Sequence, residues 1–396
     1  MIARNHATAM LLLVLSTPPA LGGPTAGHDG KFFLADDSGD HRLDISAQLQ
    51  IRYQGTFRDA DPAVIGADND VTLGFVMRRT KLRLDGRDRS GRLSYKLVGA
   101  FSRSLGMLAL EDAQFTLGLS DDWSLTLGQF KAPLLREELV SFSSQLTSDR
   151  SVTTGTFTAT WTQGVQLAWS SDRARTSAMV SDGLKQVNTS YNAVGESDFA
   201  ITARAEVLLG KAGDWKRFND FTSWRGSDFN AMLGGALNWQ TTGDTNPSAA
   251  SGAGKDIDSL TLTTDLSLEG NGWNAFACFI WRRTDAAAMP AFDDFGVIAQ
   301  AGVFVCERTE LFARWDAVFA DAARGLAGDD LHTITAGLNY YFLPESHAAK
   351  FTANVLWFPE PANDLAGVVK PSDSFPLLAD AKGDQIAFVI QLQLLF

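Results

Sequence analysis

Apolar and polar residues alternate along most of the chain. Between His41 and Thr56 the apolar residues fall on one face and the residues between them are polar, with the apolar set being Leu43, Ile45, Ala47, Leu49, Ile51 and Tyr53. A period of two predicts a β-strand with one apolar and one polar side. The same alternation recurs at 73–85, 92–103, 109–119, 122–131, 162–170, 173–181, 198–210, 229–240, 258–269, 272–284, 293–306, 308–321, 331–343, 348–358 and 385–396. The sequence therefore predicts sixteen strands.

The connections between these segments alternate between short and long. Short connections with turn-forming residues fall at 86–91, 120–121, 171–172, 270–271 and 344–347, and long ones fall at 56–72, 132–161, 182–197, 241–257 and 359–384. Up-and-down order places every long connection at one end, as in outer-membrane barrels. Most segments have about the ten residues that a tilted strand needs to cross a bilayer. We predict one transmembrane antiparallel β-barrel over residues 41–396, with short inner turns and long outer loops.

One connection breaks this alternation. Residues 211–228 should form a short inner turn but are long, with Trp215, Phe218, Phe221 and Trp224 spaced three apart. We interpret this segment as an amphipathic stretch that packs at the inner membrane interface.

The amino terminus has the pattern of a secretory signal peptide. Arg4 precedes the apolar run Met10–Leu15, which is followed by Pro18-Pro19 and the small residues 20–23. We expect residues 1–23 to be removed and residues 24–40 to form a short lead-in to the barrel. No later run is long and apolar enough for a transmembrane helix. The expected location is the cell outer membrane.

Composition narrows the chemistry. The net charge of −12 argues against a nucleic-acid partner. Two cysteines and five histidines offer no cluster with zinc-ligand spacing, so we expect no metal and no cofactor. Cys278 should lie opposite about residue 299, far along the strand from Cys306, which predicts two free thiols.

Several segments carry a family resemblance. The final strand alternates from Gln385 and ends on Phe396, and further motifs are Phe75-Val-Met-Arg-Arg-Thr-Lys-Leu-Arg-Leu-Asp-Gly86, Tyr95-Lys96 with Phe101, Asp112-Ala113, Gly128-Gln-Phe-Lys-Ala-Pro133 with Glu138, Asp149-Arg-Ser151 and Gly337-Leu-Asn-Tyr-Tyr341. Together they resemble the phosphate-selective porins, the outer-membrane porins of the O and P type. The resemblance implies a homotrimer, recognition of Phe396 by the barrel-assembly machinery, and passage of small anions or phosphate. It also implies that the third outer loop, 132–161, folds inward to narrow the pore.

Strand alternation assigns the polar positions to the barrel interior. The basic set is Arg52, Arg79, Lys81, Arg83, Lys96, Arg204, Arg282, Arg308, Arg314 and Lys350, and the acidic set is Asp44, Asp85, Glu206, Asp265, Glu269, Glu310 and Asp316. Arg79, Lys81 and Arg83 should line one wall over about 13 Å, which favours anions. The alternative is that they form cross-strand ion pairs with Asp85, Glu206 and the other acids.

The constriction loop carries balanced charge. Lys131, Arg136 and Arg150 stand against Glu137, Glu138 and Asp149. This balance leaves open a non-specific general-diffusion porin.

The same residues bear on other classes of protein. A hydrolase needs a serine beside a histidine, and the expected strand neighbours of His332 offer no serine. A plugged transporter needs a plug domain that the residues before the first strand are too few to form. A soluble secreted all-β binding protein stays open, because alternation alone does not say whether the apolar face meets lipid. Aromatic residues near segment ends favour the membrane, these being Tyr53, Tyr95, Phe101, Trp123, Trp273, Trp281, Trp357 and Phe396.

Overall fold

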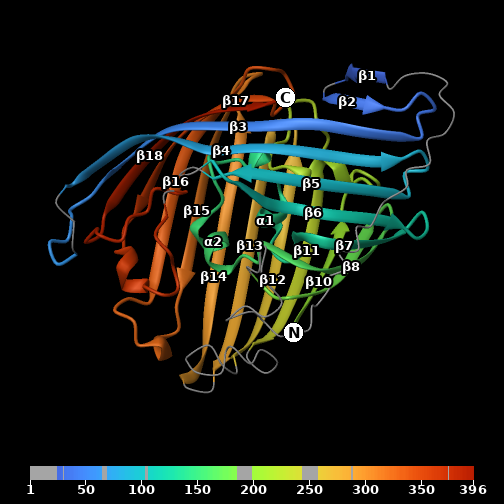
Figure 1. The fold of residues 1–396 in the computed structure, drawn as a ribbon. Helices are drawn as coiled ribbons and strands as arrows, with labels where there is room; N and C mark the ends of the chain where they lie inside the picture. The colour runs from blue at the N-terminus through green and yellow to red at the C-terminus, as the bar shows by residue number, and fades with distance from the viewer. Residues whose placement is uncertain are drawn as a thin grey trace, which may run out of the picture.

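The computed structural model describes residues 25–29, 31–64, 69–102, 106–184, 199–242, 257–286, 289–372 and 374–396. Its main body is a ring of sixteen antiparallel strands (Figure 1). They are β3 (His41–Phe57), β4 (Val71–Asp88), β5 (Leu93–Phe101), β6 (Leu108–Gly118), β7 (Trp123–Lys131), β8 (Trp161–Ser170), β9 (Ala174–Ser181), β10 (Phe199–Leu208), β11 (Asn230–Thr242), β12 (Ile257–Gly270), β13 (Trp273–Ala286), β14 (Met289–Phe304), β15 (Thr309–Phe319), β16 (Asp330–Tyr341), β17 (Ala349–Phe358) and β18 (Gln385–Leu395).

The ring is closed. Each strand pairs with its sequence neighbours, and β18 pairs with β3 from Leu395↔Gln48 to Ile386↔Phe57. The predicted sixteen-stranded up-and-down barrel is confirmed, and each predicted segment coincides with one strand. The outward apolar face of this closed ring has no second sheet to pack against, which argues against the soluble all-β alternative.

Two short strands precede the barrel and were not predicted. β1 (Thr25–His28) pairs with β2 (Phe32–Ala35), and β2 pairs with the start of β3, from Phe32↔Ile45 to Ala35↔Arg42. This pairing is possible because β18 reaches only to Gln48, which leaves the first residues of β3 as an unpaired edge. Part of the expected lead-in is therefore a β-hairpin at the inner end of the barrel. The expected signal peptide lies outside the described residues.

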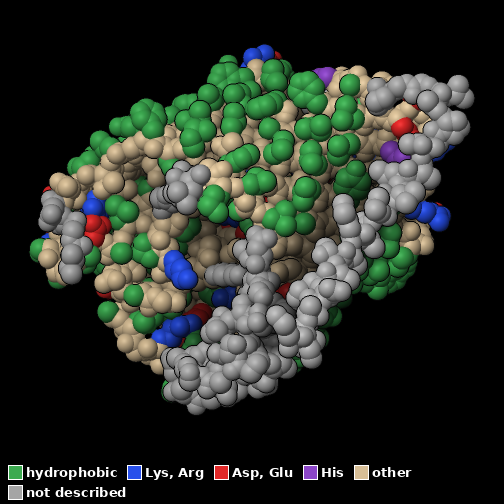
Figure 2. Space-filling view, viewed as in Figure 1, with side chains coloured by type: hydrophobic (Ala, Val, Ile, Leu, Met, Phe, Trp, Pro, Cys, Tyr) green, Lys and Arg blue, Asp and Glu red, His purple; other side chains and the backbone are tan. Residues whose placement is uncertain are grey.

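The outward face of the barrel is an apolar belt. Trp123, Trp273 and Trp357 are exposed near strand ends, and Phe75 is 82% exposed. Figure 2 shows hydrophobic side chains gathered over the wall, whereas basic side chains lie near the hollowed opening. Among the described residues, no helix has the length and apolar content that a membrane-crossing helix needs.

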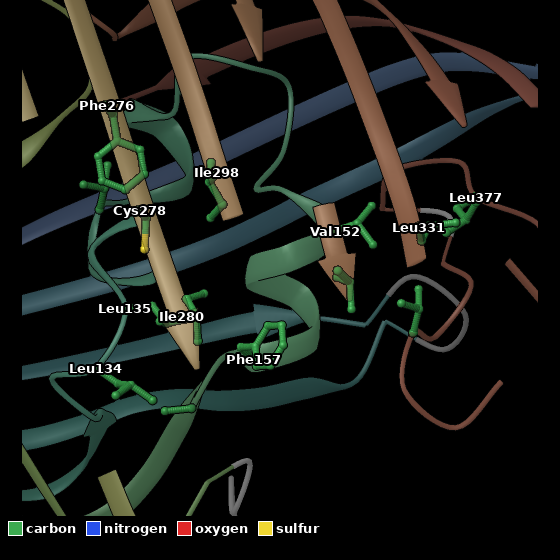
Figure 3. Close-up of a cluster of buried hydrophobic side chains, with 14 of the residues drawn as sticks. Leu134, Leu135, Val152, Phe157, Phe276, Cys278, Ile280, Ile298, Leu331 and Leu377 are labelled. Carbon is green, nitrogen blue, oxygen red and sulfur yellow. The ribbon is translucent and has the colours of Figure 1, made fainter. Parts of the chain in front are cut away.

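Part of the inward face is also apolar, contrary to the prediction of a polar interior. Phe276, Cys278 and Ile280 point inward from β13 and are at most 5% exposed. They form a buried core with residues of the third outer loop, among them Leu135 and Phe157 (Figure 3). The third outer loop therefore packs against the inward side chains of β13.

The long inner connection packs through its aromatic residues, as predicted, but inside the barrel rather than at the membrane interface, so its predicted location is wrong. Residues 209–229 contain the 3-10 helix η2 (Trp215–Asn219), and they turn into the barrel. Phe218 and Phe221 are at most 3% exposed, and the Phe221 ring lies 4.9 Å from that of Phe276 on the inward face of β13.

The two cysteines are free, as predicted. Cys278 pairs in register with Ile298, one residue from the expected position. Cys306 lies in the exposed inner turn 305–308 rather than on a strand.

Candidate pore constriction

The third outer loop, residues 132–160, lies inside the barrel and is called the constriction loop below. It contains the helices α1 (Arg136–Leu139) and α2 (Val152–Phe157), which lie inside the ring of strands (Figure 1). It also contains the 3-10 helix η1 (Phe142–Ser144). Ser151 caps α2, because its hydroxyl accepts a hydrogen bond from the Thr154 amide at 2.9 Å. The Glu137 carboxylate joins the two helices by accepting from the hydroxyls of Ser151 at 2.6 Å and Thr154 at 2.5 Å. The loop is thus a compact unit with its own internal bonds.

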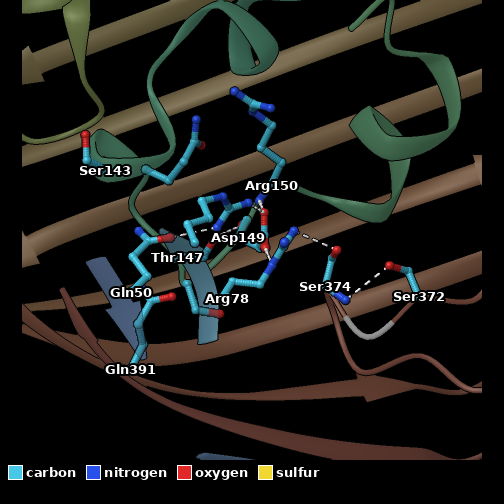
Figure 4. Close-up of polar contacts among 12 residues, drawn as sticks. Gln50, Arg78, Ser143, Thr147, Asp149, Arg150, Ser372, Ser374 and Gln391 are labelled. Carbon is cyan, nitrogen blue, oxygen red and sulfur yellow. Dashed lines mark hydrogen bonds and ion pairs between the residues drawn. The ribbon is translucent and has the colours of Figure 1, made fainter. Parts of the chain in front are cut away.

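Asp149 of this loop is held by three arginines of the barrel wall. Its carboxylate lies 2.8 Å from Arg79, 2.9 Å from Arg78 and 3.0 Å from Arg52. Figure 4 shows Arg78 reaching both Asp149 and the Ser374 hydroxyl of the last outer loop. Burial raises the pKa of Asp149, but the three guanidinium groups outweigh it and hold that pKa well below its ordinary value. Asp149 therefore stays charged and locks the loop to β3 and β4.

A β-bulge explains why two consecutive arginines reach one carboxylate. The pairing of β3 with β4 shifts between Gln50↔Arg79 and Ile51↔Met77, which leaves Arg78 as the extra residue. A strict period of two puts Arg78 on the face opposite to Arg79, so the alternation missed it. A signal was present: the outward apolar residues Leu73, Phe75 and Met77 have odd numbers, whereas Leu82 after the bulge has an even number.

A second bulge places two acids side by side. The register of β5 with β6 shifts between Val98↔Asp112 and Gly99↔Leu110, so Glu111 is the extra residue. Glu111 lies 2.5 Å from Lys81, and Asp112 lies 3.2 Å from Lys96. Sequence reasoning missed both acids as ion-pair partners.

Glu138 and Arg150 form a further pair within the constriction loop. Arg150 donates to the Glu138 carboxylate at 2.9 Å and to its carbonyl at 2.8 Å, and Lys131 at the end of β7 donates to the same carbonyl at 2.8 Å. Burial raises the pKa of Glu138, but Arg150 and Lys131 outweigh that effect and lower it.

Two cavities meet at the constriction loop. The outer cavity, of about 520 Å³, and the inner cavity, of about 880 Å³, share two lining residues, Phe142 and Trp161. These two aromatic side chains therefore mark the narrowing between the cavities.

Four cations surround the Phe142 ring. The guanidinium carbons of Arg79 and Arg150 lie 3.5 and 3.6 Å from its centroid. Two guanidinium groups at these distances would overlap on one face of the Phe142 ring. They therefore lie on opposite faces of it. The ammonium groups of Lys81 and Lys131 lie 4.8 and 5.2 Å from the same centroid and 5.6 and 5.1 Å from that of Trp161. The predicted charge balance of the loop is thus offset by cations that the wall supplies.

Both cavities carry an excess of basic side chains. Among the described residues, the inner cavity has eight basic and three acidic lining residues, which are Lys31, Lys81, Arg83, Lys96, Lys131, Arg136, Arg175 and Arg204 against Glu111, Asp112 and Glu206. The outer cavity has five against three, which are Arg78, Arg150, Arg282, Arg324 and Lys370 against Glu138, Asp149 and Asp294. The interior path is therefore positive in a chain whose net charge is −12.

Apart from Arg79, which is described above, and Arg308, the predicted basic wall residues fall into two groups. Lys81, Arg83, Lys96 and Arg204 line the inner cavity and Arg282 lines the outer one. Arg83 is paired at 2.5 Å with Asp85, the partner that the ion-pair alternative named, and Arg204 lies 2.9 Å from both Glu206 and Asp265. The four residues of the inner cavity face the open volume while paired with an acidic side chain. Arg282 instead donates to the Phe157 carbonyl at 2.7 Å.

The other group holds the back of the constriction loop. Arg314 donates to the Asp149 carbonyl at 3.0 Å and lies 3.2 Å from Glu137, while Lys350 donates to the Gln145 carbonyl at 2.8 Å. Arg52 belongs here through Asp149, and all three are at most 3% exposed. Arg308 is neither, because it lies in the exposed inner turn 305–308 and donates to the Phe342 carbonyl at 3.2 Å. Its predicted place on the barrel wall is wrong.

One group outside the barrel lumen has metal-ligand residue types. Ligand atoms of Asp330, His332 and Glu360 lie within 4.8 Å of one another. The Trp315 indole donates to Nδ1 of His332 at 3.1 Å, so in the neutral ring the proton sits on Nε2, which lies 3.3 Å from Asp330. Both ring nitrogens of His332 therefore have hydrogen-bond partners in the protein. The three residues form a hydrogen-bonded cluster where β16 begins.

The comparisons with known proteins agree with this geometry. The family of phosphate-selective porins O and P matches residues 47–245, half of the chain. The chain belongs to this family. It is therefore an outer-membrane porin, and the family and fold indicate a channel rather than an enzyme.

Solved structures share the fold at low sequence identity. The anion-selective porin of Comamonas acidovorans superposes with a TM-score of 0.61 at 12% identity, covering 90% of this chain and 100% of that one. OmpT of Vibrio cholerae gives 0.60 at 13%, covering 92% and 100%, and the channel DcaP of Acinetobacter baumannii gives 0.56 at 11%, covering 91% and 99%. No curated protein sequence matches the chain significantly.

Proposed function

We propose that this porin conducts small hydrophilic anions in preference to cations, with phosphate among the permeant ions. The observation that supports the proposal is the basic excess along both cavities and around Phe142. Basic side chains in a channel with low-dielectric walls raise the local concentration of anions and lower that of cations. The similar porin of Comamonas acidovorans is described as anion-selective, which agrees with this proposal.

The guanidinium groups at the narrowing already have hydrogen-bond partners in the protein. This argues that the electrostatic field of the pore selects anions, rather than tight binding of an anion to a site. Arg150 is engaged by Glu138 and by the carbonyls of Glu137 and Val140, while Arg79 is engaged by Gln50 and Asp149. Donors that already have protein partners do not replace the hydration shell of a phosphate ion at low cost. Weakly selective general diffusion is therefore the second candidate.

Bilayer recording separates these candidates. The purified protein is inserted into a planar bilayer under a KCl gradient, and phosphate is then titrated into the chloride solution. Anion-selective current that phosphate blocks would establish a phosphate-binding porin. Anion-selective current without block would leave field-based selection, and cation-selective current would refute the proposal.

The same proposal extends to assembly. We infer that the signal peptide 1–23 directs export, that the barrel-assembly machinery recognises Phe396, and that three copies associate in the outer-membrane lipid. Phe396 supports this inference because its backbone pairs with Ala47, at 2.6 and 3.1 Å, while its side chain is 50% exposed. Deletion of Phe396 should lower the yield of folded barrel in the outer membrane, and cross-linking of the native membrane should give a trimeric ladder.

A further inference from the structure

The inner connection and the constriction loop enter the barrel from opposite ends and meet inside it. The Phe221 amide of the inner connection donates to the Ser144 carbonyl of the constriction loop at 3.2 Å. The Arg136 guanidinium of the loop donates to the Phe218 carbonyl and lies 5.4 Å from the centroid of the Phe221 ring. Residues 209–229 thus contact the constriction loop through backbone, charge and ring.

This inner connection is itself anchored to the wall. The Ser223 hydroxyl donates to the Gly270 carbonyl at 2.6 Å, and the Gly272 amide donates to the Trp224 carbonyl at 3.2 Å. Phe218 is fully buried in a small core with Leu208 and Met232. An anchored segment that touches a second segment at several points transmits its rigidity to that segment.

The contact of Arg136 and Ser144 with Phe218 and Phe221, called the joint below, lies on one side of the conducting path. Arg136 lines the inner cavity together with Arg204 and Glu206, whereas Phe221 is buried against Phe276 on the wall behind. Movement of the joint would move η1, which carries Phe142, and so would change the narrowing between the two cavities.

We propose that the inner connection is a strut that fixes the constriction loop from the inner side, with Arg136 and Phe221 as the positioning residues. The strut sets how wide and how steady the narrowing is. Phe221 is buried behind the loop, so it affects conduction without contacting the permeating ion.

Single-channel recording of matched variants tests the strut. Phe221→Ala should raise the open-channel current noise and lower the voltage at which the channel closes, whereas Phe221→Leu should keep wild-type behaviour. The matched control is Phe229→Ala, because Phe229 is on the same connection but is 58% exposed. Heat-modifiable migration on gels reports whether each barrel is folded.

A second variant guards against misfolding of Phe221→Ala. Arg136→Gln removes the bond to Phe218 while leaving Phe221 in place, and it should shift noise and closing voltage in the same direction. The double variant should shift them no further than the stronger single variant, because both act through one joint. Noise and closing voltage of Phe221→Ala and Arg136→Gln equal to those of Phe229→Ala would overturn the proposal. A cation-selective wild type would refute the proposed ion preference but would not affect this comparison.

Discussion

The carboxylate of Asp149 and the guanidinium of Arg79 lie 2.8 Å apart, and both side chains are at most 6% exposed. This pair joins the constriction loop to the barrel wall at the height of Phe142, because the same guanidinium covers one face of that ring. Arg79 therefore both holds the constriction loop and contributes positive charge to the narrowing.

Replacing Asp149 with Asn should separate those two roles. Removing one partner of a buried ion pair costs about 3–5 kcal/mol, and here three arginines lose their shared carboxylate. We expect Asp149→Asn to lower the temperature at which the barrel unfolds on gels and to increase anion selectivity in bilayer recordings. Unchanged unfolding together with unchanged selectivity would contradict the ion-pair geometry.

Two carboxylates of the constriction loop, Asp149 and Glu138, should change selectivity only at acidic pH. The pKa values of Asp149 and Glu138 are held below their ordinary values of 3.8 and 4.5 by the neighbouring cations. The stabilisation that comes from a lowered pKa is fully present above the ordinary value and is lost as pH falls through the lowered value. The contribution of these two carboxylates to the reversal potential should therefore stay constant from pH 7 to about pH 4 and change only below that. A change that begins near pH 6 in the wild type and is absent in Asp149→Asn would contradict the lowered pKa of Asp149.

Gly128 should tolerate no side chain. Its φ angle is +121°, and a Cβ atom there would lie 2.2 Å from the Ala113 carbonyl oxygen of the neighbouring strand. Gly128→Ala should destabilise the barrel by about 1–3 kcal/mol through backbone strain, with the steric clash adding to that cost. The folded fraction on heat-modifiability gels should fall accordingly. Gly74→Ala is the control, because a Cβ atom at Gly74 meets nothing within 4 Å. Equal folded fractions for the two variants would count against the described β6–β7 pairing.

The buried core under the loop should control loop order. Phe157, the last residue of α2, is fully buried with its ring against Gly296 of β14, and truncation of a buried phenylalanine costs about 3–5 kcal/mol. We expect Phe157→Ala to loosen the constriction loop and to increase its proteolytic cleavage in folded barrels. Phe75→Ala removes an outward ring that is 82% exposed and should leave cleavage at the wild-type level. Similar cleavage in both variants would argue against a core that holds the loop.

The strands could be predicted from the sequence because alternation and turn residues are local signals. The bulges at Arg78 and Glu111 could not be read from a strict period of two, although the change of parity from Met77 to Leu82 marks the first one. The apolar inward face of β13 was hidden because Phe276 and Phe279 make the strand apolar on both sides. Contacts between distant segments, such as Arg52 with Asp149, depend on how the loop folds inside the barrel, which no local pattern specifies.

The most direct test of the account is the reversal potential of the charge-reversed variant Arg79→Glu with Lys81→Glu under a KCl gradient. Both cations flank Phe142, so their reversal should shift the channel toward cation selectivity. Arg89→Glu is the control, because Arg89 lies in an inner turn with a side chain that is 74% exposed. If the double variant keeps the wild-type reversal potential while its barrel is folded, the cations around Phe142 do not determine the ion preference.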